Sequence, residues 1–466
     1  MLKLRLRLSC MAALYLLLSV ASASAAEKMN VLFIAVDDLN DWISPLGGYE
    51  GCQTPHLERL AKRGITFTKA YCAAPACNPS RAAIMTGIRP WSSGVYQNSQ
   101  PWRPAMPDAV TMPQHFTKHG YHSTGAGKIF HGAFDEPESW EYYLTRKGDP
   151  KPTQAVLKDP HSKSGGIVWG VLDVKDEDMN DFNTASYAVD YLSQEHDKPF
   201  YLACGIFRPH MPWQVPRKYY DMYPLDEINT PYVPDGDLSD VPEAGVKMAN
   251  PTKDHGTMLK TGNWKYAVQA YLASITFADT QIGRVLDALE SSAYNDNTIV
   301  VLWGDHGWHL GEKEHWRKFA LWEEATRVPF FMSVPGVTPP GSRCDRTVDL
   351  MCIYPTLCDL CEIPITDQLE SKSIKGLLKD PAMEWAQPAV TTHGRKNHAV
   401  RNERFRYIRY ANGGDELYDH DADPGEFNNL ASDPAYKETI DELVKSLPKN
   451  DAPEAKASRA RESGDN

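Results

Sequence analysis

Two long apolar runs, each ending abruptly in charged residues, constrain the fold of this chain more than any other feature. Residues 30–36 (Asn-Val-Leu-Phe-Ile-Ala-Val) lead directly into two aspartates, and residues 298–303 lead into Gly-Asp-His-Gly. Continuous apolar runs are typical of strands buried on both faces of a parallel sheet. Open α/β sheets place their ligands beyond the carboxyl ends of such strands. The charged residues at the two strand ends are Asp37, Asp38, Asp305 and His306.

These side chains have the chemistry of a metal site. Three carboxylates with one imidazole form a hard, oxygen-rich donor set, which suits Ca²⁺ or Mg²⁺ better than Zn²⁺. Either pair alone is more simply explained as a strand-end cap. Because both pairs follow buried-strand patterns, in a chain that also carries the segment around Cys77, the metal site is the favoured interpretation.

The segment from Cys77 to Gly87 (Cys-Asn-Pro-Ser-Arg-Ala-Ala-Ile-Met-Thr-Gly) has the composition of a catalytic centre. Cys77 is a potential nucleophile, and Pro79 stiffens the turn after it. Arg81 can bind an anion or stabilise a modified Cys77. A helix is predicted from Pro79 onward, so Cys77 should lie at its N-terminus, where a thiolate or a sulfate is favoured.

Strand and helix patterns alternate over residues 27–365, which predicts a doubly wound, mainly parallel α/β sheet. Residues 366–448 alternate like antiparallel strands followed by a helix, and predict a smaller C-terminal subdomain. The polar tail, 449–466, is expected to be mobile. Residues 135–180 and 208–260 are expected to be irregular loops that shape a substrate pocket. Helices are predicted over residues 54–64, 111–120, 183–195, 266–289 and 348–360.

Residues 1–26 have the layout of a secretory signal peptide: three cations, an apolar run and small residues at the end. The alternative, a membrane anchor, is less favoured because the apolar run is short for a span. We therefore expect export to the periplasm or the extracellular space, with no membrane partner after cleavage. Without these cations the chain is more acidic than its net charge of −12, which argues against a nucleic-acid partner.

The chain contains nine cysteines, of which Cys10 lies in the signal segment. Seven remain beside Cys77, an odd number that cannot all pair within one chain. Cys358 and Cys361 have the CxxC spacing, but no second CxxC accompanies them. Buried thiols are the preferred interpretation over redox or zinc chemistry.

The segment that begins Cys77-Asn78-Pro79-Ser80-Arg81 resembles the signature of the type I sulfatases. The resemblance continues at Asp37-Asp38, Gly127-Lys128, Gly304–Gly307 and Glu416–Asp419, so it covers nearly the whole mature chain. Within that family the sequence is most similar to the iduronate-2-sulfatase-like branch. The motifs that indicate this branch are 36–39, 127–131, 208–212 and 305–312, with His131 three positions after Lys128. The family implies an alkaline-phosphatase-like fold.

The resemblance also implies roles for individual residues. Cys77 would become formylglycine through a formylglycine-generating enzyme, and its hydrate would be the nucleophile. Arg81 would hold an oxygen of that hydrate. One Ca²⁺ would be bound by the modified Cys77 together with Asp37, Asp38, Asp305 and His306.

The remaining implied roles concern charge and protons. Lys128 and Lys318 would neutralise charge on the sulfate, although Arg317 is an equally cationic neighbour of Lys318. His210 would protonate the leaving alkoxide, and His131 would accept the proton that releases sulfate. Candidates for contacts with the sugar are Trp102, Arg103, Trp308 and His309.

The function predicted on this basis is hydrolysis of a sulfate ester on a sulfated sugar, with the 2-O-sulfate of a uronic acid as the resemblance-based candidate. A phosphonate or phosphate ester hydrolase is the alternative within enzymes. A non-catalytic binder of sulfated polysaccharide is a third possibility. The sequence argues against the binder, because the nucleophile, the metal ligands, both lysines and both histidines are all present.

Overall fold

The computed structural model of the protein describes residues 28–145 and 148–458. The predicted signal peptide, 1–26, lies outside the described residues. Within residues 28–145 and 148–458, no helix combines the length and the apolar character that crossing a membrane requires.

The core is an eight-stranded sheet with the strand order β13-β2-β12-β9-β1-β7-β3-β4. The pairings of β12 with β9 and β2 are antiparallel, and the other pairings in this sheet are parallel. Every residue of β1, β7 and β9 is buried, as their apolar sequences predict. The strands are β1 Asn30–Val36, β2 Ile65–Tyr71, β3 His122–Gly127, β4 Tyr142–Leu144, β7 Phe200–Ile206, β9 Thr298–Gly304, β12 Phe330–Ser333 and β13 Ser342–Asp349.

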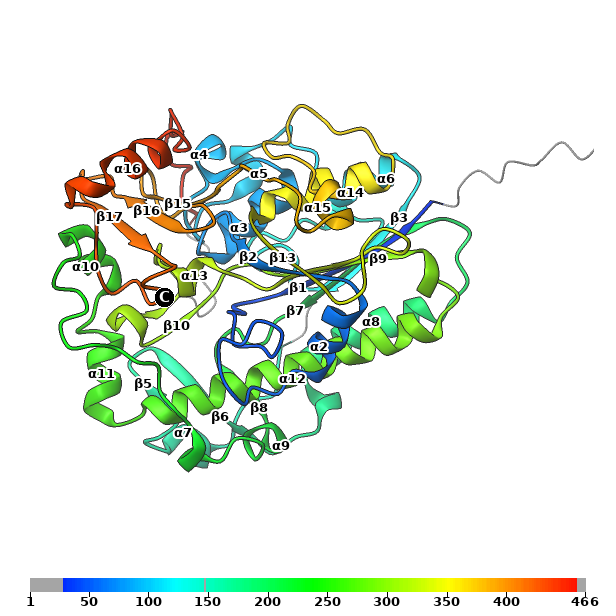
Figure 1. Cartoon of the computed structure of the whole chain (residues 1–466). Helices are drawn as coiled ribbons and strands as arrows, with labels where there is room; N and C mark the ends of the chain where they lie inside the picture. Colours follow the sequence, from blue (N-terminus) through cyan, green and yellow to red (C-terminus); the bar gives the residue numbers. More distant parts are fainter. Residues whose placement is uncertain (1–27, 146–147, 459–466) are drawn as a thin grey trace, which may run out of the picture.

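Helices cover both faces of this sheet (Figure 1). Alternate residues of β1 belong to separate apolar clusters: Leu32 and Ile34 face one layer, and Val31 and Phe33 face the other. The prediction of a doubly wound sheet is confirmed. The first layer contains α2 Pro55–Arg63, α8 Asn180–Leu192 and α12 Trp264–Ser291; the second contains α3 Cys77–Thr86, α6 Met112–Lys118, α14 Ile353–Leu360 and α15 Lys375–Lys379.

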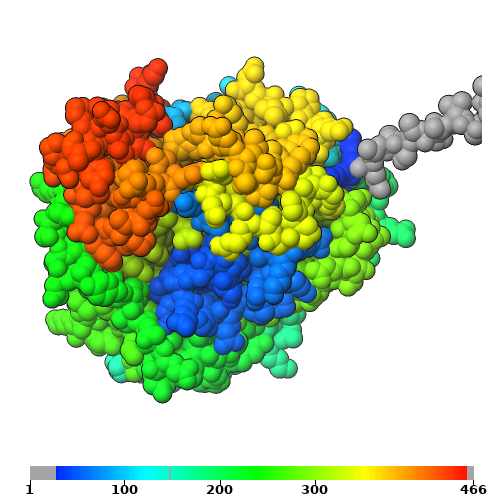
Figure 2. All heavy atoms as spheres, in the orientation of Figure 1, coloured from blue at the N-terminus to red at the C-terminus, as the bar shows by residue number. Residues whose placement is uncertain are grey.

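The C-terminal part forms the expected smaller unit, a four-stranded antiparallel sheet with a helix (Figure 1, orange to red). One face of this sheet packs on α16 through Leu443, and the other packs on the catalytic domain near Trp322. In Figure 2 the same segments cover one corner of the molecule. The elements are β14 Ala389–Thr392, β15 His398–Arg401, β16 Phe405–Arg409, β17 Asp415–Asp419 and α16 Lys437–Val444.

Two sequence-based expectations about local structure are wrong. The helix predicted from residue 348 begins at Ile353, because residues 342–349 pair with β2 as a strand. The segments predicted as irregular contain β6 Ile167–Leu172 and β8 Trp213–Pro216, which pair with each other in parallel. Pairing between distant segments cannot be seen in a local pattern.

The described part of the tail, residues 449–458, contacts the body of the protein. Ala452 N–H donates to the Trp91 carbonyl (2.7 Å), and Ala455 N–H donates to the Gly94 carbonyl (2.8 Å). Tyr96 also donates to the Ala452 carbonyl, at 2.9 Å. The mobility of the tail stays a prediction.

All eight described cysteines are buried and unpaired by disulfides. Burial raises the pKa of Cys358 to about 12 and that of Cys361 to about 11. The expectation of buried thiols is confirmed for these residues.

Candidate active site

The ends of β1 and β9 bring the predicted acidic residues together. Asp305 N–H donates to the Val36 carbonyl (3.2 Å), so the chain after β9 lies beside the end of β1. Asp305 Oδ1 in turn accepts from the backbone N–H of Asp38 at 3.1 Å. All of these side chains are fully buried. The predicted convergence of the two strand ends is therefore present in the structure.

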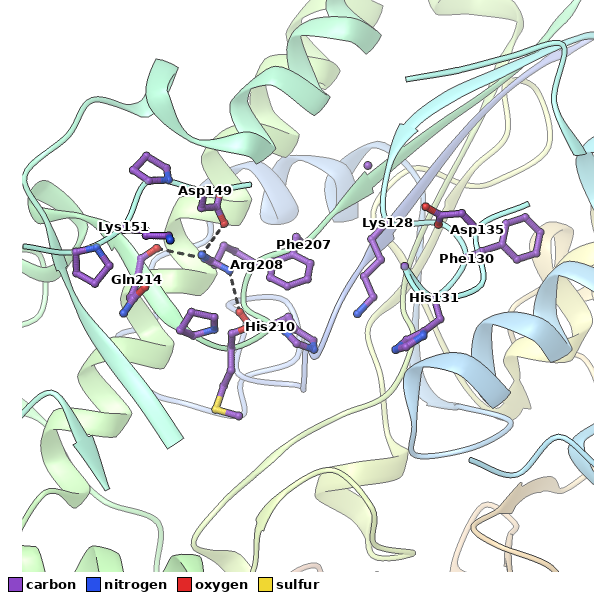
Figure 3. Close-up of a pocket in the computed structure, with 16 residues that line it drawn as sticks. Lys128, Phe130, His131, Asp135, Asp149, Lys151, Phe207, Arg208, His210 and Gln214 are labelled. Carbon is purple, nitrogen blue, oxygen red and sulfur yellow. Dashed lines mark hydrogen bonds and ion pairs between the residues drawn. The ribbon is translucent and has the colours of Figure 1, made fainter. Parts of the chain in front are cut away.

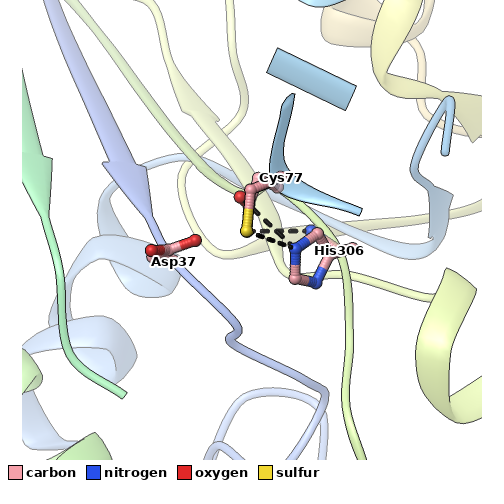
Figure 4. Close-up of side chains that lie close together, drawn as sticks. Asp37, Cys77 and His306 are labelled. Atoms are coloured by element: carbon pink, nitrogen blue, oxygen red, sulfur yellow. Dashed lines mark hydrogen bonds and ion pairs between the residues drawn. The ribbon is translucent and has the colours of Figure 1, made fainter. Parts of the chain in front are cut away.

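Helix α3 places Cys77 at its first residue, directly against these strand ends. The Cys77 Sγ atom lies 3.2 Å from His306 Nε2 (Figure 4). It also lies 3.1 Å from Lys318 Nζ. Atoms of Asp37, Cys77, Asp305 and His306 that could bind a metal all lie within 4.8 Å of one another. Residues from three distant parts of the chain thus meet at one point.

Arg81, one turn after Cys77 on α3, fixes the strand ends to the helix. Its guanidinium contacts Asp305 Oδ2 at 2.7 Å and Asp37 Oδ1 at 3.3 Å. It also donates to the carbonyl of Lys128 at 2.5 Å and of Ile129 at 3.1 Å. Arg81 is completely buried, and its ion pairs offset the large cost of removing a guanidinium from water. The arginine therefore orders both acidic residues and the start of the loop after β3.

Two buried lysines approach the same centre from opposite sides. Lys128 Nζ lies 2.5 Å from Asp37 Oδ2, and Lys318 Nζ lies 2.9 Å from Asp38 Oδ1. Arg317, the alternative to Lys318, instead pairs with Asp254 at 2.7 Å and does not reach the centre. The structure thus brings Lys318 to Cys77, as predicted.

Burial and charge determine the protonation of these groups. Burial by itself would raise the pKa of Asp37, but the cations around it, with Lys128 first, hold that pKa well below its usual range. Burial raises the pKa of Asp305 in spite of Arg81. Burial, assisted by the charge of Asp37, raises the pKa of the Cys77 thiol well above its ordinary value. The unmodified thiol is therefore a poor nucleophile, since the thiolate is the reactive form.

The residues present fit a hard divalent cation. Both carboxylate oxygens of Asp37 and Oδ2 of Asp38 are buried, and their neighbours include Lys128 Nζ, 2.5 Å from Asp37 Oδ2, and His210 Nε2, 4.0 Å from Asp38 Oδ2. Asp38 adopts a positive φ of 58°, an unusual backbone conformation for a non-glycine residue that turns its carboxylate toward this centre. Oxygen ligands of this kind suit Ca²⁺ or Mg²⁺.

A cavity of about 340 Å³ opens beside the centre (Figure 3). Lys128, His131 and His210 line the part nearest to Cys77. His210 Nε2 lies 4.0 Å from Asp38 Oδ2, and its Nδ1 lies 2.6 Å from the Met211 carbonyl, which fixes the orientation of the ring. The cavity therefore connects the predicted proton-transferring histidines to a space large enough for a sugar unit.

Sequence reasoning missed several residues of this cavity. Arg208 is buried and pairs with Asp149 at 2.8 Å, which ties the segment before His210 to the loop at 149–152. The Arg208-Pro209-His210 motif marked this segment, but nothing in the sequence connected it to the loop. The other lining residues that were not predicted include Asp135, Lys151, Phe207 and Gln214.

The predicted sugar contacts require correction, because none of the four side chains lines the cavity. Trp102 is 1% exposed and stacks on Phe130 inside the apolar core. Arg103 pairs with Glu136 at 2.9 Å. Trp308 and His309 are buried as well, with Trp308 beneath Lys318. Their apolar or paired surroundings make them structural.

A buried cysteine at a helix N-terminus, strand-end carboxylates and paired lysines define a hydrolase of anionic esters. Residues 29–363 match the Sulfatase family, and residues 311–452 match the model of the N-sulphoglucosamine sulphohydrolase C-terminal region. The chain therefore belongs to the type I sulfatase family and is a sulfuric ester hydrolase. Its fold is alkaline-phosphatase-like, as the resemblance implied.

The chain is 40% identical to a sulfatase of Formosa agariphila, over 91% of this chain and 87% of that protein. It is 30% identical to the iduronate 2-sulfatase of Mus musculus, over 73% of this chain and 70% of the mouse protein. A solved 2-O GAG sulfatase superposes with a TM-score of 0.71 at 25% identity, covering 90% of this chain and 91% of that one. The iduronate-2-sulfatase-like branch is thus among its relatives.

Proposed function

We propose that this enzyme removes an O-sulfate group from a sulfated sugar, with the 2-O-sulfate of a uronic acid as the first candidate. One observation carries the proposal: Lys318 Nζ lies 3.1 Å from Cys77 Sγ, while Lys128 and His210, beside Asp37 and Asp38, line an adjoining cavity of about 340 Å³. The names of relatives support the sulfate position, since they include an iduronate 2-sulfatase and a 2-O GAG sulfatase.

Two groups would complete the site. Formylglycine made from Cys77 would supply a hydroxyl nucleophile in place of the thiol, and Ca²⁺ held by Asp37, Asp38, Asp305 and His306 would supply positive charge beside the sulfate. The raised pKa of the Cys77 thiol supports the first, because an unmodified thiol would stay protonated here. The buried, oxygen-rich donor set supports the second.

The protein's own cations would bind the sulfate. Lys128 and Lys318 are buried and fixed by carboxylates, so their positive charge is preorganised before substrate arrives. Such preorganised charges stabilise a transition state most strongly, because no reorganisation is needed when charge develops. The role of Arg81 in holding the nucleophile's oxygen stays a prediction; its contacts support a role in ordering Asp37 and Asp305.

The two cavity histidines would move protons. His210 directs Nδ1 at a backbone carbonyl, which leaves Nε2 to face the Asp38 carboxylate and the cavity. A general acid for the leaving alkoxide must present its proton to the cavity, and Nε2 is the ring nitrogen in that position. His131, on the opposite wall, would accept the proton that accompanies release of sulfate.

Mass spectrometry and a sulfate-release assay test this proposal together. The enzyme is produced with and without a formylglycine-generating enzyme, and the tryptic peptide 70–81, which contains Cys77, is analysed. We expect sulfate release from 2-O-sulfated uronates to rise in proportion to the converted fraction. Full activity of the unconverted protein would contradict the modification. Turnover of phosphonate esters without turnover of any sulfated sugar would support the alternative hydrolase.

We also propose that residues 1–26 direct export and are then removed. The cationic, apolar and small-residue regions of this segment support the proposal. N-terminal sequencing of the protein from its native host should start close to residue 27. A chain that retains residue 1 would contradict cleavage.

A further inference from the structure

A second hollow, of about 560 Å³, lies where the catalytic domain meets the C-terminal sheet and α10 (Glu243–Ala249). It shares no lining residue with the cavity of Lys128 and His210. The residues that carry its chemistry are Gln97, Glu243, Lys247, Phe319, His393 and Asn397. Nothing in the mechanism described above uses this hollow.

Two walls of the hollow are anchored to the segment that carries Cys77. Phe319, the residue after Lys318, donates its backbone N–H to the Pro75 carbonyl at 3.0 Å. The side chain of Asn78 donates to the carbonyl of Gln97, also at 3.0 Å. Both contacts lie within two residues of Cys77. The hollow therefore adjoins the reacting centre, on the side formed by the C-terminal subdomain.

The lining of the hollow suits hydroxyl groups. Gln97 and His393 supply an amide and an imidazole to the lining, and Nδ1 of His393 is buried without a hydrogen-bond partner among the described residues. The rings of Phe319 and His393 lie 6.0 Å apart and are tilted by 39°, and they add aromatic surface to the polar groups. An amide, an imidazole and an aromatic face are the groups that bind a pyranose ring.

The charge of the hollow is balanced. Burial lowers the pKa of His393 to about 4, so its ring is neutral at ordinary pH. Glu243 and Lys247 carry opposite charges one turn apart on α10. In the reacting centre, by contrast, the buried cations Lys128, Lys318 and Arg81 lie directly against the carboxylates of Asp37, Asp38 and Asp305. A second anionic group on the ligand would therefore gain little binding free energy in this hollow.

We propose that this hollow is a subsite for an uncharged sugar unit that neighbours the sulfated unit of the same oligosaccharide. This inference rests on the proposed function and narrows it: the substrate is at least a disaccharide, and its unsulfated part is recognised through Gln97 and His393.

The test compares two substrates: a 2-O-sulfated uronate monosaccharide, and the disaccharide in which it is linked to unsulfated N-acetylglucosamine. The variants are Gln97→Leu and His393→Phe, with Gln194→Leu as the matched control, an exposed glutamine between α8 and the start of β7 that lines neither hollow. Losing one neutral hydrogen bond corresponds to about 3- to 10-fold. We expect each variant to lower kcat/KM by that factor for the disaccharide only, and the control to change neither substrate.

Equal losses on both substrates, or no loss on the disaccharide, would overturn the subsite. Failure of the wild-type enzyme to release sulfate from either substrate would overturn the proposed function instead. In that case ligand-observed NMR with the neutral disaccharide N,N′-diacetylchitobiose still decides the subsite. Binding to the wild type that is lost in the Gln97→Leu/His393→Phe double variant supports the inference, and equal signals from both proteins contradict it.

Discussion

Lys128 and Lys318 bind the neighbouring carboxylates of Asp37 and Asp38 from two regions that are built differently. Lys128 directly follows β3, and its backbone N–H donates to the Gly205 carbonyl at 2.9 Å, so it continues the sheet. Lys318 lies in an irregular segment, residues 311–319, which we call the strap. Four non-glycine residues of the strap have positive φ angles of 49° to 79°: Lys313, Glu314, Arg317 and Phe319. Such conformations are unfavourable for these residue types.

Besides the short antiparallel pairing of β11 (Trp316–Arg317) with β10 (His309–Leu310), side-chain contacts hold the strap. Lys313 Nζ binds Asp237 Oδ1 at 2.8 Å, and Arg317 Nε binds Asp254 Oδ2 at 2.7 Å. The ring nitrogens of His315 lie 2.9 Å from the Ala249 carbonyl and 2.8 Å from the Lys318 carbonyl. The position of Lys128 thus depends on the sheet, and the position of Lys318 depends on a few long-range contacts. Single substitutions should disturb the strap more easily.

The largest effect on turnover should come from substitution of Cys77, which lies between the two regions. Cys77→Ala removes the nucleophile, and we expect turnover to fall by at least about 10⁴-fold, because loss of a nucleophile removes the whole covalent route. Sulfate release measures the loss. The melting temperature serves as the control and should stay close to that of the wild type. Residual turnover of one per cent or more would show that Cys77 is not the nucleophile.

Removal of the metal should have the next largest effect on turnover. It affects the sheet side, because Asp37 and Asp305 follow strands β1 and β9. Chelation should lower turnover by about 10³-fold and lower the melting temperature, because a ligand bound only to the folded state stabilises it. Added Ca²⁺ should restore both. Isothermal titration calorimetry of the chelated protein measures the binding directly. Unchanged activity and no binding heat would exclude a divalent cation at Asp37 and Asp305.

The two lysines test the comparison itself. Lys128→Met and Lys318→Met should each lower kcat by about 10²- to 10³-fold, since each removes one preorganised charge from the transition state. Stopped-assay kinetics at saturating substrate measures kcat for both. Similar losses would show that the strap positions its lysine as well as the sheet does. A tenfold smaller loss for Lys318→Met would show that the strap holds its lysine less firmly.

A smaller effect should follow from loosening the strap without touching its lysine. His315→Ala removes the contact to the Lys318 carbonyl, and we expect kcat to fall about tenfold with a loss of about 2 kcal/mol in unfolding free energy. Kinetics and urea unfolding measure these quantities. The matched control is His196→Ala, away from the site, which should leave kcat unchanged. Equal kcat in both variants would contradict a positioning role for His315.

The smallest effect on activity should come from Asp279, which accepts hydrogen bonds from the first residues of α2 on the sheet side. Burial raises the pKa of Asp279 from 3.8 to about 7. The folded state therefore keeps this proton at pH values where the unfolded chain has lost it. Stability relative to Asp279→Asn should fall as pH rises from 4 to 7, by at most about 4 kcal/mol.

Urea unfolding at several pH values measures this difference, and kcat at pH 7 should remain close to that of the wild type. A pH-independent difference between the two proteins would show that the carboxyl titrates normally. Asp279 would then contribute no pH-dependent stability to the sheet side. The difference between the sheet side and the strap would be correspondingly larger.

The sequence alone determined the features that depend on local pattern. Apolar runs predicted β1 and β9, and because parallel strands end at one edge, Asp37 and Asp305 could be placed together. The helix pattern placed Cys77 at the start of α3. The spacing of the sulfatase-like motifs selected Lys318 over Arg317, and the structure confirms its approach to Cys77.

Tertiary structure decided what depends on packing between distant segments. A tryptophan that binds a sugar and a tryptophan in a core can have the same local sequence. Only the tertiary structure shows that Trp102 stacks on Phe130 and belongs to the same apolar cluster as Tyr201. The strap has no periodicity, and its shape follows from partners such as Asp237 and Asp254. The hollow beside Phe319 exists only because the C-terminal sheet closes over the catalytic domain. Long-range contacts of this kind leave no periodic trace in a sequence, because each partner is chosen by the fold and not by its neighbours.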